Sequence, residues 1–276
     1  NPTNTALRYN LGWLQYMRQQ YTNALVPLRE AAKLAPGDYE LSVLLGKTLL
    51  KAGLDDEAAG VLERVRTLRK DHLFTRLLEG EYLAHRQKGD KAVALLTALA
   101  QEYPDSYQVH LLLGETCLGL KRHDDALQYL ALASQLDFQD PRPRLLMVDI
   151  YLLQKKGSLA MKELQQLRRT HPRDNDVLAR LIRLYHERQE WDRLIPAGKV
   201  LLARDAGNQD VLYSTGLALV KVDDPALQDP KLAATMLWKV LELHKDDKTF
   251  LALLLDVLKQ TGEVRKIRAV ERLLGN

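Results

Sequence analysis

Apolar residues recur along the chain in short stripes at helical spacing, and polar turns separate the stripes. The stretch 45–65 holds two such stripes on either side of the turn 52–57. Gly53 in this turn breaks the first stripe, and the acidic residues after it cap the second. Helices this short cannot bury enough surface to fold alone. The pattern therefore predicts a helix pair that packs against other elements of the same kind.

The pair repeats with a period of 34 residues, and three columns mark the register. The small residue of the first helix is Gly12, Gly46, Gly80 and Gly114. The small residue of the second helix is Ala24, Ala58, Ala92, Ala126 and Ala160. A leucine follows each of these alanines at Leu28, Leu62, Leu96, Leu130 and Leu164. The small residues allow the two helices of a pair to approach closely, and the leucines fill the space around the contact.

These columns divide the chain into eight repeats, the seventh with a five-residue insertion and the eighth truncated: 5–38, 39–72, 73–106, 107–140, 141–174, 175–208, 209–247 and 248–276. The sixth repeat departs from the pattern, because Leu194 replaces the alanine and Gly198 replaces the leucine. Pro196 in the same helix is tolerable only near a first helical turn. We therefore expect distorted packing around the sixth repeat.

A period of 34 residues built from two helices resembles the tetratricopeptide repeat. In the first repeat, the residues at that family's offsets are Leu11, Gly12, Ala24, Leu28, Ala31 and Pro36. The resemblance implies an all-α fold, a right-handed α-solenoid (superhelix) of about eight helix–turn–helix units in a single domain over residues 1–276. Each repeat leaves an apolar face that only the next repeat covers.

Composition limits the class of protein and the kinds of site that the chain can contain. No run approaches the roughly 18 apolar residues that a membrane span needs. The single cysteine, Cys117, falls in a buried column, which excludes an internal disulfide and a cysteine-based metal site. The Leu-, Ala-, Arg- and Gln-rich repeats look bacterial, so we expect a soluble protein of the bacterial cytoplasm or periplasm. Because the chain begins at Asn1 rather than Met, we expect a processed form or an excised part of a longer chain.

Recognisable catalytic and metal-binding motifs are missing from the sequence. It has no Gly-rich phosphate loop, no HExxH and no GxSxG. His186-Glu187 resembles part of a zinc motif but lacks the second histidine, and the acidic stretch 223–229 lacks the alternating carboxylates of a calcium loop. The sequence therefore predicts a protein that is not an enzyme and binds no cofactor or metal.

In the tetratricopeptide family the first helices line a concave groove, and the resemblance implies which side chains face it. The predicted partner-binding residues are Tyr9, Asn10, Trp13, Tyr16, Met17, Leu44, Lys47, Leu78, Glu81, His85, Leu112, Glu115, Asp149, Arg180 and Arg183. Trp and Tyr are common binding hot spots, so we expect binding to centre on Trp13 and Tyr16. At least one leucine of each adjacent pair is instead expected to be buried between first helices. The Lys and Asn that clamp chaperone tails are replaced by Tyr9 and Trp13, so a chaperone adaptor of that kind is not expected.

Charge gives a weaker signal. The net charge is +4, and the basic residues of 155–204 are interleaved with acidic ones and have few aromatic neighbours. Nucleic-acid binding is therefore not expected. The fourth position of five repeats is polar, which indicates stems that snorkel over the core or, alternatively, a basic track in the groove. These residues are Arg8, Ser42, Arg76, His110 and Arg144.

Taken together, the sequence predicts a non-catalytic protein–protein interaction scaffold that binds a peptide or helix of a partner in its groove. The expected context is assembly of a bacterial multiprotein system for secretion, pili, envelope polysaccharide or an organelle. The alternative is a regulatory or substrate-recruiting arm of a larger enzyme. The apolar residues of the last helix also predict a possible homo-oligomer through the C-terminal end.

Overall fold

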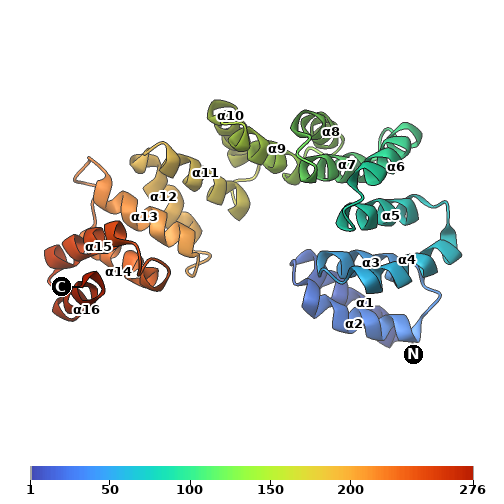
Figure 1. The fold of residues 1–276 in the computed structure, drawn as a ribbon, viewed down its shortest axis with the longest axis horizontal. Coiled ribbons are helices and arrows are strands. Elements are labelled where there is room, and N and C mark those ends of the chain that lie inside the picture. The colour runs from blue at the N-terminus through green and yellow to red at the C-terminus, as the bar shows by residue number, and fades with distance from the viewer. Residues whose placement is uncertain (1, 276) are drawn as a thin grey trace. The chain divides into compact units, whose positions relative to one another are not determined.

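The computed structural model describes residues 2–275, and all regular elements within that range are helical (Figure 1). The helices are α1 (Pro2–Met17), α2 (Tyr21–Leu34), α3 (Tyr39–Lys51), α4 (Asp55–Arg69), α5 (Leu73–His85), α6 (Gly89–Glu102), α7 (Tyr107–Gly119), α8 (His123–Leu136), α9 (Arg142–Leu153), α10 (Gly157–Thr170), α11 (Asn175–Glu187), α12 (Trp191–Leu202), α13 (Gln209–Lys221), α14 (Pro230–Lys239), the 3-10 turn η1 (Leu241–Leu243), α15 (Lys248–Thr261) and α16 (Val264–Leu274). The described α-helices form eight pairs, one for each predicted repeat. The predicted all-α fold is confirmed.

The chain divides into two compact bodies, an N-terminal body, Asn1–Ile150, and a C-terminal body, Tyr151–Asn276. In the N-terminal body α1, α3, α5 and α7 each pack on the second helix of their own repeat. In addition α1 packs on α3, α3 on α5 and α5 on α7, so that these four first helices lie side by side (Figure 1). In the C-terminal body α11, α12 and α13 pack in the same manner, and α15 packs on α16. The row of first helices in the N-terminal body is the surface on which most of the predicted binding residues lie.

The sequence columns form the core. Ala92 and Leu96 are 0% exposed, and a Cβ added to Gly80 would lie only 2.8 Å from Leu96 Cδ2. Small residues are therefore needed where the helices of a pair cross, as the sequence predicts. Cys117 is fully buried, as its column predicts.

A column of left-handed residues joins the two helices of most pairs. Gln19, Gln87, Lys121, Lys155 and Gln189 all have φ between 56° and 59°. Gly53 and Gly262 occupy the same place in their repeats, with φ of 74° and 73°. This left-handed conformation costs free energy for residues that have a side chain, but not for glycine. The tight turn is therefore kept even where the sequence supplies no glycine.

In the sixth repeat the second helix is continuous although it contains Pro196. Pro196 lies in the middle of this helix, α12, rather than in its first turn. Leu194 is fully buried, and a Cβ added to Gly198 would lie 2.0 Å from Thr215 Oγ1 of α13. The glycine that replaces the usual leucine therefore marks a close approach of α13 to α12. The expectation that Pro196 must stand at a helix start was wrong.

Candidate functional site

A pocket of about 440 Å³ lies between the first helices of repeats one to three, α1, α3 and α5. We call it the aromatic pocket. Its lining residues come from α1, α3, the end of α4 and the start of α5: Tyr9, Trp13, Tyr16, Tyr39, Glu40, Val43, Leu44, Lys47, Arg69, His72 and Phe74. The chain has only 3 Trp, 11 Tyr and 3 Phe, and five of these aromatic residues line this one pocket. Aromatic side chains offer a large contact area at low conformational cost, so the pocket is suited to holding a side chain of another molecule.

Exposure separates the accessible wall of the aromatic pocket from its support. Trp13 is 47% exposed and Phe74 is 39% exposed. Leu44 is only 9% exposed and belongs to the core of the N-terminal body. Trp13 and Phe74 therefore present apolar surface that another molecule can cover, while Leu44 supports them from below.

A hydrogen-bond network fixes one side of the aromatic pocket. The Tyr39 hydroxyl lies 2.9 Å from His72 Nδ1 and 3.0 Å from Thr75 Oγ1. Thr75 Oγ1 in turn donates to the carbonyl oxygen of Arg69 at 2.6 Å. The guanidinium carbon of Arg69 lies 4.9 Å from the centre of the Tyr39 ring, within the range of a cation–π contact. The positions of Tyr39 and Arg69 are thus set before any partner arrives.

Lys47 brings a positive charge to the same pocket. Its Nζ lies 5.7 Å from the centre of the Phe74 ring, and its side chain is half-buried. Burial lowers the pKa of Lys47, and the nearby Glu81 carboxylate opposes that shift. Glu81 itself is paired with Lys51. Among the described residues, no carboxylate lies within ion-pair distance of Lys47.

A second hollow of about 480 Å³, the charged pocket, lies between α3, α5 and α7. Its residues are Lys51, Glu81, Ala84, His85, Gln87, Gly89, Leu112, Glu115, Thr116, Gly119 and Leu120. Lys51 Nζ lies 3.2 Å from Glu81 Oε1, and only 9% of the Glu81 side chain is exposed. Burial raises the pKa of Glu115, and Lys51 opposes the rise. The charged pocket thus carries more carboxylates than ammonium groups.

Tyr16 lies within the electrostatic influence of both Glu81 and Lys51. Burial and then the Glu81 carboxylate raise the pKa of Tyr16 to about 12, and the Lys51 ammonium opposes them. The Tyr16 hydroxyl is therefore protonated at neutral pH and is available as a hydrogen-bond donor.

Nine predicted residues lie in these two pockets. Those of the aromatic pocket are Tyr9, Trp13, Tyr16, Leu44 and Lys47, and those of the charged pocket are Glu81, His85, Leu112 and Glu115. Asn10 lines, with Tyr9, a separate hollow of about 600 Å³ beside the end of α2. Met17 is 59% exposed at the end of α1.

Two predicted residues need correction. Leu78 is 1% exposed, because it packs against Gly46 between α3 and α5, and so cannot contact a partner. Leu44 is 9% exposed and belongs to the core of the N-terminal body, so it offers little contact surface. The burial of Leu78 agrees with the expectation that at least one leucine of each adjacent pair is buried, and Leu77 is buried as well. In the pair Leu111-Leu112 the first leucine is buried and the second is half-buried.

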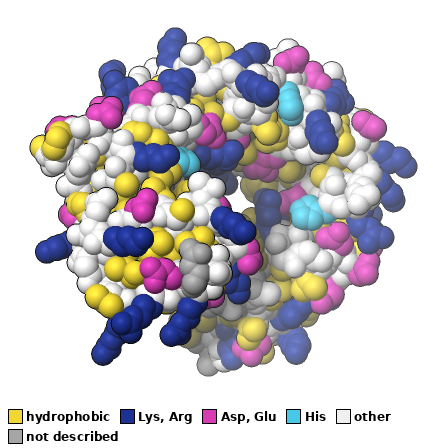
Figure 2. All heavy atoms as spheres, turned by 60° about the vertical axis from the view of Figure 1, so that its left-hand side comes forward, with side chains coloured by type: hydrophobic (Ala, Val, Ile, Leu, Met, Phe, Trp, Pro, Cys, Tyr) yellow, Lys and Arg dark blue, Asp and Glu magenta, His cyan; other side chains and the backbone are white. Residues whose placement is uncertain are grey.

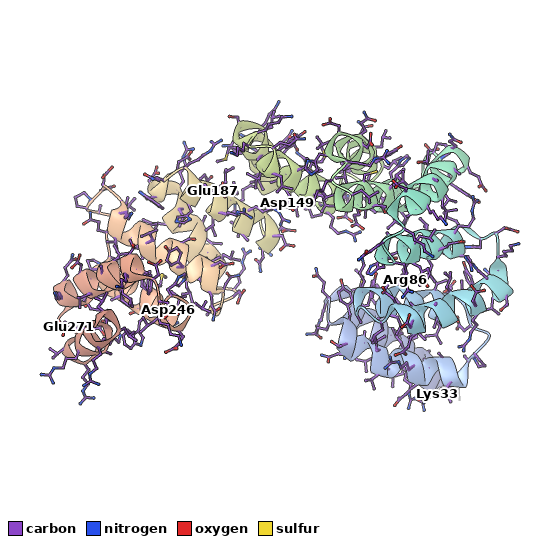
Figure 3. All side chains as sticks on the ribbon, viewed as in Figure 1. Lys33, Arg86, Asp149, Glu187, Asp246 and Glu271 are labelled. Atoms are coloured by element: carbon purple, nitrogen blue, oxygen red, sulfur yellow. The ribbon has the colours of Figure 1, made fainter. Side chains whose placement is uncertain are left out.

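The remaining predicted residues lie apart from these pockets. Asp149 is on α9, where Figure 3 labels it. Arg180 and Arg183 are on α11 of the C-terminal body, and Arg183 Nε donates to Glu187 Oε1 at 3.1 Å. Arg8 and Arg76 are paired with Glu30 and Glu102, which favours the prediction of snorkelling stems over that of a basic track.

The sequence reasoning missed Tyr39, Arg69 and His72 of the aromatic pocket. A signal for them exists, because Tyr107 and Asp140 occupy the positions of Tyr39 and His72 two repeats later. The Tyr107 hydroxyl donates to Asp140 Oδ2 at 2.6 Å, which repeats the Tyr39–His72 contact. A tyrosine that opens a repeat and a polar residue that closes it therefore form a recurring pair.

The face shown in Figure 2 carries side chains of both charges. Lys and Arg side chains are spread over the face in Figure 2, with Asp and Glu side chains among them. Within residues 2–275, no group of three metal-ligating side chains comes together, and no helix is long and apolar enough to cross a membrane.

Part of the chain matches a known family. A tetratricopeptide repeat model matches residues 16–73 and 83–150. The "TPR repeat-containing protein PA4667" of Pseudomonas aeruginosa is 33% identical over 122 residues, which are 43% of this chain and 20% of that protein. The match thus spans about a fifth of the length of that relative.

Solved structures share the fold at low sequence identity. The tetratricopeptide protein TTC0263 of Thermus thermophilus superposes with a TM-score of 0.59 at 21% identity, covering 65% of this chain and 98% of that one. YrrB, described as a TPR protein with an unusual peptide-binding site, superposes with a TM-score of 0.53 at 12% identity, covering 70% and 96%. At these identities the likeness concerns the fold.

Proposed function

We propose that this tetratricopeptide repeat protein is a non-catalytic scaffold that binds a peptide or helix of a partner protein along α1, α3, α5 and α7. The observation that carries the proposal is the aromatic pocket, in which Trp13 and Phe74 stand partly exposed over a fixed wall. Exposed apolar surface of this kind is usual at interaction sites, and tryptophan is enriched among binding hot spots.

The arrangement also supports a binding role over a catalytic one. The charged groups of the groove are held by ion pairs and ring contacts, such as Lys51–Glu81 and Lys47–Phe74. In the aromatic pocket the Tyr39 hydroxyl beside His72 Nδ1 is also held by Thr75 Oγ1, which makes it part of the fixed wall. The peptide-binding site named for YrrB is consistent with this role, and the relative in Pseudomonas aeruginosa supports a bacterial setting.

The test is selection of peptides from a random display library on the immobilised protein, followed by affinity measurement in solution with fluorescently labelled hits. We expect Trp13→Ala to weaken the selected peptides by about 2 kcal/mol, or roughly thirtyfold. Phe138→Ala is the matched control, because Phe138 is 74% exposed and lies outside both pockets. Equal affinities for the wild-type protein and Trp13→Ala would contradict the proposed site, and so would failure to select any peptide.

A further inference from the structure

The aromatic pocket carries an excess of positive charge that no described residue neutralises. Lys47 and Arg69 line it, and Glu40 is the one carboxylate among its described lining residues. Lys47 and Arg69 each face an aromatic ring, Phe74 and Tyr39 respectively, and neither has a carboxylate within ion-pair distance among the described residues. An aromatic ring stabilises a cation less strongly than a hydrogen-bonded anion does. The pocket therefore lacks an anion that pairs with Lys47 and Arg69.

The two cations are also held in place. Arg69 ends α4, and its carbonyl oxygen accepts the Thr75 hydroxyl, while its guanidinium lies on the Tyr39 ring. Lys47 is on α3 and is half-buried against the Phe74 ring. Because both side chains already have fixed positions, an anion that binds them causes little further loss of side-chain entropy. Partial exclusion of water strengthens the attraction at Lys47, which is half-buried, whereas Arg69 is exposed.

We propose that the aromatic pocket takes a large apolar or aromatic side chain of the partner segment together with a carboxylate from a neighbouring Asp or Glu of that segment, which pairs with Lys47 and Arg69. This inference rests on the proposed function and specifies the sequence that the groove selects. The apolar side chain covers Trp13 and Phe74, and the carboxylate supplies the charge that the pocket lacks.

The charged pocket argues for a peptide rather than a nucleic acid as the occupant. Single-stranded nucleic acids need a continuous track of cations for successive phosphates. The groove next to the aromatic pocket instead presents Glu81 and Glu115 against Lys51 alone. A repeated anion would be repelled there, whereas a peptide can confine its acidic residue to the aromatic pocket.

The experiment uses the peptides selected on the wild-type protein. Their sequences are compared with the unselected library for Asp or Glu within two positions of an aromatic or large apolar residue. We expect this pattern to be enriched. In the best peptide, replacing the acidic residue with its amide should weaken binding to the wild-type protein by about tenfold or more, the range for a hydrogen-bonded charge pair.

Variants then assign the effect to the pocket. Lys47→Gln and Arg69→Gln should each reduce the difference between the acidic peptide and its amide version in part. On the double variant Lys47→Gln, Arg69→Gln the two peptides should bind with nearly equal affinity, because both partner charges are gone. Lys33→Gln is the matched control, since Lys33 is an exposed lysine at the end of α2, outside the pocket (Figure 3). It should preserve the full difference.

The outcomes separate this inference from the proposed function. Peptides that depend on Trp13 but lack an acidic residue would overturn the inference and leave the scaffold role intact. A charge effect that survives the double variant Lys47→Gln, Arg69→Gln would do the same. Selection of basic peptides would also overturn it and would assign the charged pocket as the principal site. A single-stranded oligonucleotide that displaces the peptide at equal concentration would contradict the choice of partner class.

Discussion

Lys51 Nζ on α3 lies 3.2 Å from Glu81 Oε1 on α5, and this ion pair joins the first helices of two adjacent repeats. The Glu81 side chain is 9% exposed, whereas that of Lys51 is 34% exposed. The carboxylate therefore depends on the ammonium, because water reaches it poorly. Both residues of the pair line the charged pocket, and among the described residues Lys47 has no carboxylate within ion-pair distance.

Removal of Lys51 should destabilise the N-terminal body. We expect Lys51→Met to lower the free energy of unfolding by about 1–3 kcal/mol, because it leaves a nearly buried carboxylate unpaired. The double variant Lys51→Met, Glu81→Met should recover most of the loss, since well-packed apolar residues can replace a buried ion pair. Urea unfolding followed by circular dichroism measures both, and a double variant less stable than the single one would contradict this account.

Two glycine-to-alanine substitutions should have opposite effects. In Gly80→Ala the new Cβ would meet the fully buried Leu96 at 2.8 Å, so we expect a loss of about 1–3 kcal/mol. Gly60→Ala on α4 has no heavy atom within 4 Å of the new Cβ, so the better helix former should gain about 0.5–1 kcal/mol. Thermal unfolding of the two variants, compared with the wild-type protein, checks both signs.

The left-handed column predicts a second pair of opposite effects. Gly53→Ala should cost about 1 kcal/mol, because φ at this position is 74° and alanine is strained there. Gln87→Gly relieves the same strain at φ of 56°, and the gain is reduced by the greater freedom of glycine in the unfolded chain. We expect a net stabilisation below about 1 kcal/mol, read from the urea midpoint. A destabilised Gln87→Gly would show that its side chain contributes more than its backbone costs.

Glu115 should make stability depend on pH. Burial raises its pKa above the ordinary 4.5, so the folded protein holds this proton more tightly than the unfolded chain does. Its contribution to stability is present below about pH 4.5 and is lost as pH rises through the raised pKa. Above the raised pKa the ionised carboxylate is unfavourable, and there Glu115→Gln should be more stable than the wild-type protein.

The pH profile provides the check for Glu115. The advantage of Glu115→Gln should shrink as the pH is lowered toward 4.5, where the wild-type carboxyl is protonated. Glu242→Gln serves as the control, because the Glu242 side chain is 89% exposed and its substitution should change stability little at either pH. An advantage that stays constant across the range would assign the effect to packing rather than to ionisation.

The sequence predicts the repeats well because each column reports a contact that recurs at the same spacing. Ala92 and Leu96, for example, are both fully buried in the crossing that their columns predict. A close helix crossing admits only small residues on one side, and this restriction is visible in a single sequence once it is repeated.

The candidate site was only partly predictable. Trp13 and Lys47 follow from the helical face on which they lie, but Leu78 shares that face and is buried. The difference arises because α5 lies close enough to α3 for Leu78 to reach Gly46. Arg69 and His72 come from the end of a second helix and the following turn, so the spacing of the first helices says nothing about them.

By itself the sequence determined the all-α fold, the register of the helix pairs and the helix face that carries the aromatic residues, because these depend on local periodicity and on residue size. The tertiary structure alone decided that Lys47 lies over the ring of Phe74 and Arg69 over the ring of Tyr39, and that Lys51 rather than Lys47 pairs with Glu81. It also decided that Gln87 and Lys121 adopt left-handed turns that their residue types disfavour. In each case the packing of neighbouring helices fixes distances between residues far apart in the chain, and those distances outweigh local preference.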